Sequence, residues 1–179
     1  MIPEAPLEPT EGGLVPAGEG WFVLNARDAL WKEGDFGSYT RFEGAARFPE
    51  LGFNIGVLQP GQPSCMYHGE DSQEDFLVLS GSCLLLVEGE ERLLRAWDFV
   101  HCPAWTEHVF VGAGDGPCVL LAVGARPDEE VVYPAAEFAQ RHGAAVERET
   151  REGAEAYASF RDDVPTGYRD GWLPNFRAG

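Results

Sequence analysis

The strongest constraint on the fold is the frequent interruption of short β-prone runs by turn residues between positions 21 and 123. The chain has 22 glycines and 13 prolines among its 179 residues, and such a composition disfavours long helices. This spacing, sustained over roughly a hundred residues, predicts an all-β fold of the sandwich, jelly-roll or barrel type. Val87–Arg92 contains a tight hairpin turn between two of the runs. The predicted strands are Trp21–Leu24, Tyr39–Phe42, Phe53–Leu58, Phe76–Leu79, Cys83–Val87, Glu91–Leu94, Phe99–Cys102, His108–Val111 and Val119–Val123.

The chain divides into three parts of different character. Residues 1–20 are predicted to form an N-terminal arm without regular structure, because they are rich in Pro, Glu and Gly without periodicity. Residues 21–126 form the predicted barrel, and residues 127–179 a helix followed by a wrapping tail. The helix is predicted over Tyr133–Gly143, with proline in its first turn and glycine at its end. The tail is polar with isolated aromatic residues, and we expect it to pack on the barrel or on a partner subunit. These aromatic residues are Tyr157, Phe160, Tyr168, Trp172 and Phe176.

The charge balance excludes several classes of partner. Acidic residues outnumber basic ones by 30 to 13, which gives a formal charge of −17, and the single lysine is Lys32. Such a surface repels nucleic-acid phosphates and anionic lipid headgroups, so we expect no nucleic-acid or membrane partner. The first residues have neither a basic segment nor an apolar one of signal-peptide type. The four cysteines form no C-x-x-C pair, which predicts reduced thiols in a cytoplasmic protein.

Two histidines and two glutamates are the candidate metal ligands. If residues 68–70 are extended, His68 and Glu70 project from the same face. Glu74 follows a turn and opens the next strand, and His108 opens a later strand that could face the same point from across the barrel. Imidazole suits Zn, Fe, Ni or Cu, while carboxylates add affinity for harder Mn or Fe(II). Three protein ligands on an octahedral ion leave positions for water, dioxygen or a chelating substrate.

At these residues the sequence resembles the cupin superfamily. The first motif of that family, G(X)5HXH(X)3,4E(X)6G, matches at His68, Glu74 and Gly81, and the second, G(X)5PXG(X)2H(X)3N, matches at Pro103 and His108. The fifteen residues 82–96 separate the two motifs, and the resemblance covers roughly residues 50–125. Departures occur at five positions. In the first motif, Glu70 replaces the second histidine, and the leading glycine, Gly61, stands one residue early. In the second motif, Trp97 and Trp105 replace the two glycines, and Gly112 replaces the final asparagine.

The resemblance implies a double-stranded β-helix, or jelly-roll barrel, with one short C-terminal helix, and a homodimer built by sheet extension or arm exchange. It implies His68, Glu74 and His108 as ligands of a divalent transition metal (Zn, Fe, Mn or Ni). Glu70 stands in for the missing histidine, as a fourth ligand or as a catalytic base. An extra carboxylate favours harder ions over copper. The implied activity is that of a metal-dependent enzyme on a small organic substrate, of oxygenase, isomerase or lyase type.

Simpler interpretations remain open for the same residues. His68 and Glu74 can be polar lining of a non-catalytic barrel that binds a small molecule, with a structural ion or none. Desolvating four such side chains together is costly, which favours a cation among them. The tail can instead dock a partner in a scaffolding role. We assign His101 a structural or supporting role and His142 a helix-terminal one. Trp97, Trp105, Phe76 and Phe110 are either core residues or the aromatic mouth of a ligand site.

Overall fold

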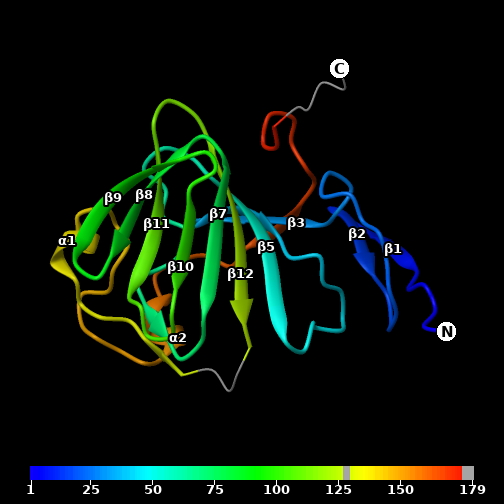
Figure 1. Cartoon of the computed structure of the whole chain (residues 1–179), viewed down its shortest axis with the longest axis horizontal. Helices are drawn as coiled ribbons and strands as arrows, with labels where there is room; N and C mark the ends of the chain where they lie inside the picture. The colour runs from blue at the N-terminus through cyan, green and yellow to red at the C-terminus, as the bar shows by residue number, and fades with distance from the viewer. Residues whose placement is uncertain (127–129, 175–179) are drawn as a thin grey trace.

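The computed structural model describes residues 1–126 and 130–174, in which two antiparallel sheets face each other across a barrel (Figure 1). The larger sheet has the order β10 (Phe99–Cys102), β7 (Glu74–Ser80), β12 (Cys118–Ala125), β5 (Leu51–Leu58), β4 (Gly37–Thr40), β3 (Trp31–Gly34) and β14 (Val164–Thr166). The smaller sheet has the order β11 (His108–Ala113), β8 (Ser82–Val87) and β9 (Glu90–Arg95). Two short pairs accompany them, β1 (Leu7–Thr10) with β2 (Gly13–Pro16) and β6 (Gly69–Glu70) with β13 (Val131–Val132). This architecture confirms the predicted all-β jelly roll.

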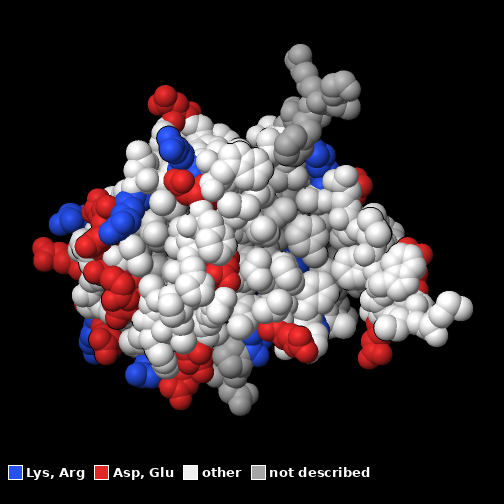
Figure 2. Space-filling model, viewed as in Figure 1, with Lys and Arg blue, Asp and Glu red and all other residues white. Residues whose placement is uncertain are grey.

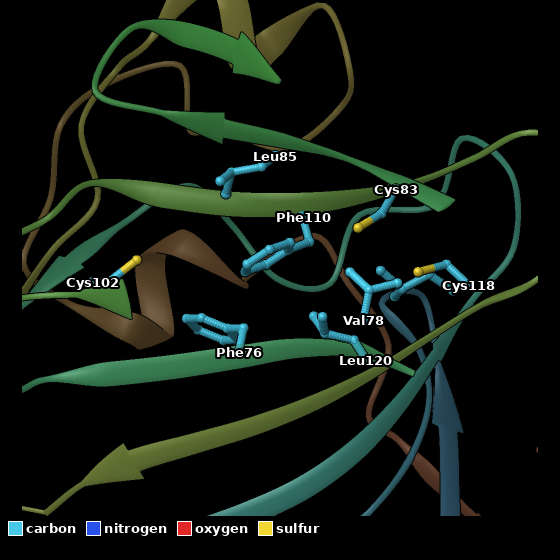
Figure 3. Close-up of a cluster of buried hydrophobic side chains, with 9 residues drawn as sticks. Phe76, Val78, Cys83, Leu85, Cys102, Phe110, Cys118 and Leu120 are labelled. Carbon is cyan, nitrogen blue, oxygen red and sulfur yellow. The ribbon is translucent and has the colours of Figure 1, made fainter. Parts of the chain in front are cut away.

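Alternate residues of the strands point into the barrel and form its core. The inward positions of β7 and β12 are in register, with Phe76 opposite Ala122 and Val78 opposite Leu120. Because side chains alternate between the faces of a strand, the same strands present their remaining residues to the outer face. Figure 3 shows the core between the two sheets. Its buried members are Leu58, Phe76, Val78, Cys83, Leu85, Cys102, Phe110, Cys118 and Leu120.

All four cysteines are free, as the sequence predicts, and three of them are buried. The thiols of Cys83 and Cys118 face each other within the core (Figure 3). This contact, followed by burial, raises the pKa of the Cys83 thiol. Cys102 lies on β10, which is separated from β12, the strand that carries Cys118, by β7.

Eight of the nine predicted strands are present, with ends that differ by a few residues. The predicted hairpin is also confirmed: Val87 pairs with Glu90, and the two turn residues Glu88 and Gly89 have φ values of 48° and 81°. Positive φ at both central positions is the type I′ geometry that matches the twist of a two-residue hairpin.

The remaining prediction, a strand over Trp21–Leu24, is wrong, because only Trp21 makes an isolated bridge, to Glu4. The segment 1–20, expected to lack regular structure, contains the β1–β2 hairpin. The proline-rich composition gave no strand signal here, and Pro16 is the one buried residue of the two strands.

The C-terminal part also differs from the prediction. The helix expected over Tyr133–Gly143 is reduced to α1 (Glu137–Gln140), because Tyr133 instead pairs with Thr150 in a β-bridge. A second single-turn helix, α2 (Gly153–Ala156), follows.

The tail packs on the barrel of its own chain, which is one of the two expected arrangements. Strand β14 pairs with β3, and the rings of Tyr157 and Phe160 lie 5.3 and 4.6 Å from that of Phe36. The predicted tail residue Phe176 lies outside the described residues. None of the helices in the described parts of the chain is long and apolar enough to cross a membrane.

Candidate metal centre

His68 and His108 are direct neighbours across a hydrogen-bonded backbone pair. His108 donates its backbone N–H to the His68 carbonyl at 2.8 Å, and His68 donates to the His108 carbonyl at 3.2 Å. Residues paired in this way project their side chains from the same face. The two imidazole centroids accordingly lie 5.2 Å apart. The predicted convergence is therefore present, although His108 approaches as a neighbour of His68 and not from across the barrel.

Each imidazole is oriented by a carbonyl two residues earlier in the chain. His68 Nδ1 lies 2.9 Å from the Met66 carbonyl oxygen, and His108 Nδ1 lies 2.9 Å from that of Thr106. A carbonyl only accepts, so both Nδ1 atoms carry the hydrogen and donate it. This arrangement directs both Nε2 atoms toward the interior, as in histidines that bind metal through Nε2.

Glu74, at the start of β7, completes a three-residue cluster with the two histidines. Its Oε2 lies 3.3 Å from His108 Nε2 and 3.9 Å from His68 Nε2. The three ligand atoms lie within 4.8 Å of one another. Ligands on one transition-metal ion at about 2.1 Å lie roughly 3–4 Å apart, so small side-chain rotations suffice for coordination.

Burial shifts the pKa values of two residues of this cluster. Burial, and then the neighbouring Glu70, raise the pKa of Glu74 to about 7. The pKa of His108 is lowered to about 4, first by burial and then by the charge of His68. Moreover, Glu74 Oε2 is buried without a hydrogen-bond partner among the described residues. A divalent cation would satisfy that oxygen and offset the cost of burying the carboxylate.

Of the two histidines, His68 is the one with a raised pKa, about 10. Burial lowers it, but the Cys65 sulfur, the Glu74 carboxylate and the Met66 carbonyl together outweigh burial. A proton on Nε2 would thus occupy the position that a metal takes, and metal binding would release it.

Glu70, the proposed fourth ligand or base, lies beside this cluster but is not one of its three members. Its Oε2 is 4.0 Å from His68 Nε2, while Oε1 accepts a hydrogen bond from the Ser72 hydroxyl. Glu70 is therefore near enough to influence the cluster, as its effect on Glu74 shows. Its role as ligand or base remains a prediction.

The cluster lies in a cavity of about 560 Å³, a volume suited to a small organic molecule. Small residues of the large sheet, Gly56 and Ala122, leave room within it, and a Cβ added at Gly56 would meet only the Leu120 carbonyl oxygen, at 4.0 Å. Further wall residues come from regions that the sequence did not associate with the site. They are Phe36, Tyr39, Arg41, Asn54, Tyr157 and Phe160. Isolated aromatics in the tail were the one sequence signal for any of them.

The other histidines lie elsewhere. His101, on β10, contacts Asp75 at 2.7 Å between Nδ1 and Oδ1 and is half exposed. His142 follows α1 and lies 3.2 Å from a Glu91 carboxylate oxygen. Neither belongs to the three-residue cluster.

The alternative of an aromatic mouth applies to only two of the four aromatic residues. Phe76 and Phe110 are buried and line the cavity. Trp97 and Trp105, by contrast, are 68% and 44% exposed and are not among its wall residues. Both tryptophans have positive φ, 75° and 68°, so they keep the left-handed backbone that suits the glycines of the second motif.

Comparisons with known proteins agree with this architecture. The family model of the Cupin domain matches residues 54–124. A sugar phosphate isomerase of the cupin superfamily from Silicibacter pomeroyi is 23% identical, with a TM-score of 0.52, over 84% of this chain and 83% of that one. A candidate sugar phosphate isomerase from Acidithiobacillus ferrooxidans is 29% identical, with a TM-score of 0.43. The match covers 46% of this chain and 54% of the length of that protein.

A search of curated proteins gives no match. The family model nevertheless spans the strands that carry the cluster, and the Silicibacter structure shares the fold over most of both chains. Residues 54–124 thus match the Cupin domain family, and the chain shares its fold with a structure of the cupin superfamily.

Proposed function

We propose that this protein is a metal-dependent enzyme acting on a small organic molecule held inside the barrel. The observation that carries the proposal is the cluster of His68, Glu74 and His108 at the wall of an open cavity, with a buried Glu74 oxygen that has no hydrogen-bond partner in the described residues. Two nitrogen donors and one oxygen donor suit Zn, Fe, Mn or Ni. Three ligands leave coordination positions open to the cavity.

The roles of the residues follow from their positions. His68, Glu74 and His108 would hold the ion, which supplies Lewis-acid or dioxygen chemistry when bound. Phe76 and Phe110 cover one side of the cluster and exclude water, with the Phe76 ring 5.1 Å from that of His108. Glu70 would accept a proton from the substrate, because its carboxylate lies at the cluster without being one of the three clustered ligands.

Elemental analysis of the purified protein tests the metal centre. We expect about one transition-metal ion per chain, and a loss of affinity of at least about 100-fold in His108→Ala. His101→Ala is the matched control, since it removes a half-exposed histidine outside the cluster. Equal metal content in both variants would refute the proposed centre.

A non-catalytic binding protein is the second candidate, favoured by the apolar walls of the cavity, including Phe36, Leu58 and Phe160. Turnover separates the two functions. An enzyme should lose activity in Glu70→Gln while keeping its metal and its ligand. A binding protein should retain ligand in both forms and convert none.

We also propose a homodimer and a cytoplasmic location. Strand β10 ends the larger sheet, and its Phe99 is 64% exposed. Figure 2 shows few charged side chains on the outer face that carries β10, β7, β12 and β5. Both features support sheet extension by a second copy. Light scattering of Phe99→Glu should show a monomer where the unmodified chain is a dimer. The free cysteines support the location.

A further inference from the structure

A second cavity, of about 400 Å³, adjoins the barrel cavity. It lies where the β1–β2 hairpin meets β3, β4 and the loop that follows, residues 41–47. Tyr39 and Arg41 line both cavities, so the two cavities are neighbours. Neither the metal ligands nor Glu70 belong to its wall.

The wall of the second cavity is basic in a chain that is otherwise strongly acidic. It includes Lys32, Arg41 and Arg47, three of only 13 basic residues in a chain with a net charge of −17. Within residues 1–126 and 130–174, no carboxylate forms an ion pair with any of these three. Six other arginines do have a carboxylate partner: Arg92, Arg126, Arg141, Arg151, Arg161 and Arg169.

The acidic residue in this wall, Glu43, interacts chiefly with an arginine outside the wall, and Arg47 adds a smaller electrostatic attraction. Glu43 accepts hydrogen bonds from both terminal nitrogens of Arg126, at 2.7 and 3.0 Å. Its charge is therefore already compensated by an arginine outside the cavity wall. Arg41 is positioned by the Tyr39 ring, whose centroid lies 5.0 Å from the guanidinium carbon. The cavity thus presents an excess of positive charge.

The loop that carries two of these cations is held closely against the hairpin. A side chain at Gly44 would collide with the Pro16 carbonyl oxygen. The preceding Phe42 has a φ of 57°, a costly conformation for a residue with a Cβ. Such local strain persists only where surrounding contacts fix the backbone, so the cation-bearing wall is a preorganised one.

We propose that this cavity binds the anionic group, a carboxylate or a phosphate, of the small organic molecule on which the barrel acts. The inference rests on the proposed function, because it places the rest of that molecule in the adjoining barrel cavity. Guanidinium groups recognise both kinds of oxyanion through paired hydrogen bonds, and Lys32 adds a point charge. The overall negative charge repels anions from the surface, so binding requires this local concentration of cations.

Calorimetric titration of the full chain tests the proposal, with inorganic phosphate and acetate as separate probes of the two oxyanions. We expect saturable binding of at least one probe, weakened about tenfold or more in Arg41→Gln and in Arg47→Gln. Arg41→Lys should bind better than Arg41→Gln because it keeps the charge. Arg92→Gln removes the same charge from the distant β9 and should bind as the unmodified chain does. Thermal denaturation of each variant identifies losses caused by unfolding.

The outcomes separate this inference from the metal proposal. Titration is repeated in chelator, where a probe held by Lys32, Arg41 and Arg47 still binds, whereas a probe held by the metal does not. Binding in chelator that fails only in the cavity variants supports the inference even if no metal is found. Equal loss in Arg92→Gln, or no saturable binding of either probe, overturns it and leaves the metal centre untouched.

Discussion

The two ends of the barrel interior are built from the same strands but differ in how their side chains are satisfied. At the closed end, Val78, Cys83 and Cys118 are fully buried in apolar contact with one another (Figure 3). At the open end, β7 contributes Glu74 and β11 contributes His108, beside the cavity. A single strand thus changes from polar to apolar along its inward face.

This difference separates stability from chemistry within one core. Close packing at the closed end stabilises the fold, because each side chain there gains apolar contact. The open end retains a cavity, a carboxyl of raised pKa and an unpartnered buried oxygen, all of which cost stability in the metal-free chain. Substitutions at the closed end should therefore change only the free energy of unfolding. Substitutions at the open end should also change the binding of metal or ligand.

The largest effect is expected from Leu85→Ala in the buried core. Leu85 is 4% exposed, and its truncation should lower the free energy of unfolding by about 2–5 kcal/mol through lost burial and a new cavity. Metal content per folded chain should not change. Denaturant unfolding measures the loss, and Leu93→Ala on the exposed face of β9 is the matched control. Loss of metal in folded Leu85→Ala would break the proposed separation.

The second prediction concerns pH and the carboxyl at the open end. The pKa of Glu74 is about 7 in the folded chain against an ordinary 4.5, so folding favours its protonated form. The stabilisation that this preference gives the unmodified chain, measured against Glu74→Gln, is complete below pH 4.5 and is lost as the pH rises to about 7. We expect this relative loss to reach up to about 3 kcal/mol in chelator.

Denaturant unfolding of both chains across this pH range measures the difference. His108 acts in the opposite sense, because its lowered pKa costs stability as pH falls from 6.5 to about 4. To a first approximation, comparison with Glu74→Gln removes that contribution, since both chains contain His108. A pH-independent difference between the two chains would contradict the assigned burial of the Glu74 charge.

A smaller effect, of opposite sign, is expected from filling the open end. Gly56→Ala places a methyl group where the nearest heavy atom is 4.0 Å away, so it should raise the free energy of unfolding by about 0.5–1 kcal/mol. Ligand affinity should fall because the cavity shrinks. Gly112→Ala is the contrasting variant, since its methyl would collide with the Gln59 carbonyl oxygen and destabilise the fold. Equal effects in the two variants would argue against an open cavity at Gly56.

The smallest effect is expected at the strained tryptophan of the β9–β10 turn. Trp97→Gly removes the cost of a left-handed backbone, partly offset by glycine entropy, and should raise the free energy of unfolding by about 0.5 kcal/mol. Trp21→Gly has no such strain to relieve and should lower it. Thermal denaturation compares the two, and a loss of stability in Trp97→Gly would show that its side-chain contacts outweigh the strain.

The sequence predicted best what local pattern and short spacing determine. The strands from β5 to β12 were found, apart from the two-residue β6, because their apolar runs end at clear turn residues. His68, Glu74 and His108 were also identified as a group. By contrast, β3 and β14 lack an apolar alternation, and they pair across more than a hundred residues of chain. Such pairing is decided by tertiary packing, which periodicity does not report.

Some residues of the site could not be predicted from the sequence for the same physical reason. Tyr157 and Arg41 reach the cavities only because the tail and the edge of the large sheet fold over the barrel mouth. Nothing in the local sequence distinguishes Arg41 from a surface residue, and the isolated aromatic Tyr157 indicated packing without indicating on what. The relation of His68 to His108 was likewise misjudged in detail, since a two-residue backbone bridge between loop and strand leaves no sequence signature.

The carbonyl anchors of the two histidines have a consequence for how this centre tolerates change. The groups that aim His68 and His108 are main-chain oxygens of Met66 and Thr106, which every amino acid would supply. No side-chain replacement at those two positions deletes the acceptor. The Nε2 lone pairs of the two histidines stay directed at the same point as long as the turns keep their shape. The surrounding pocket can therefore change toward new ligands without altering the ion-binding geometry.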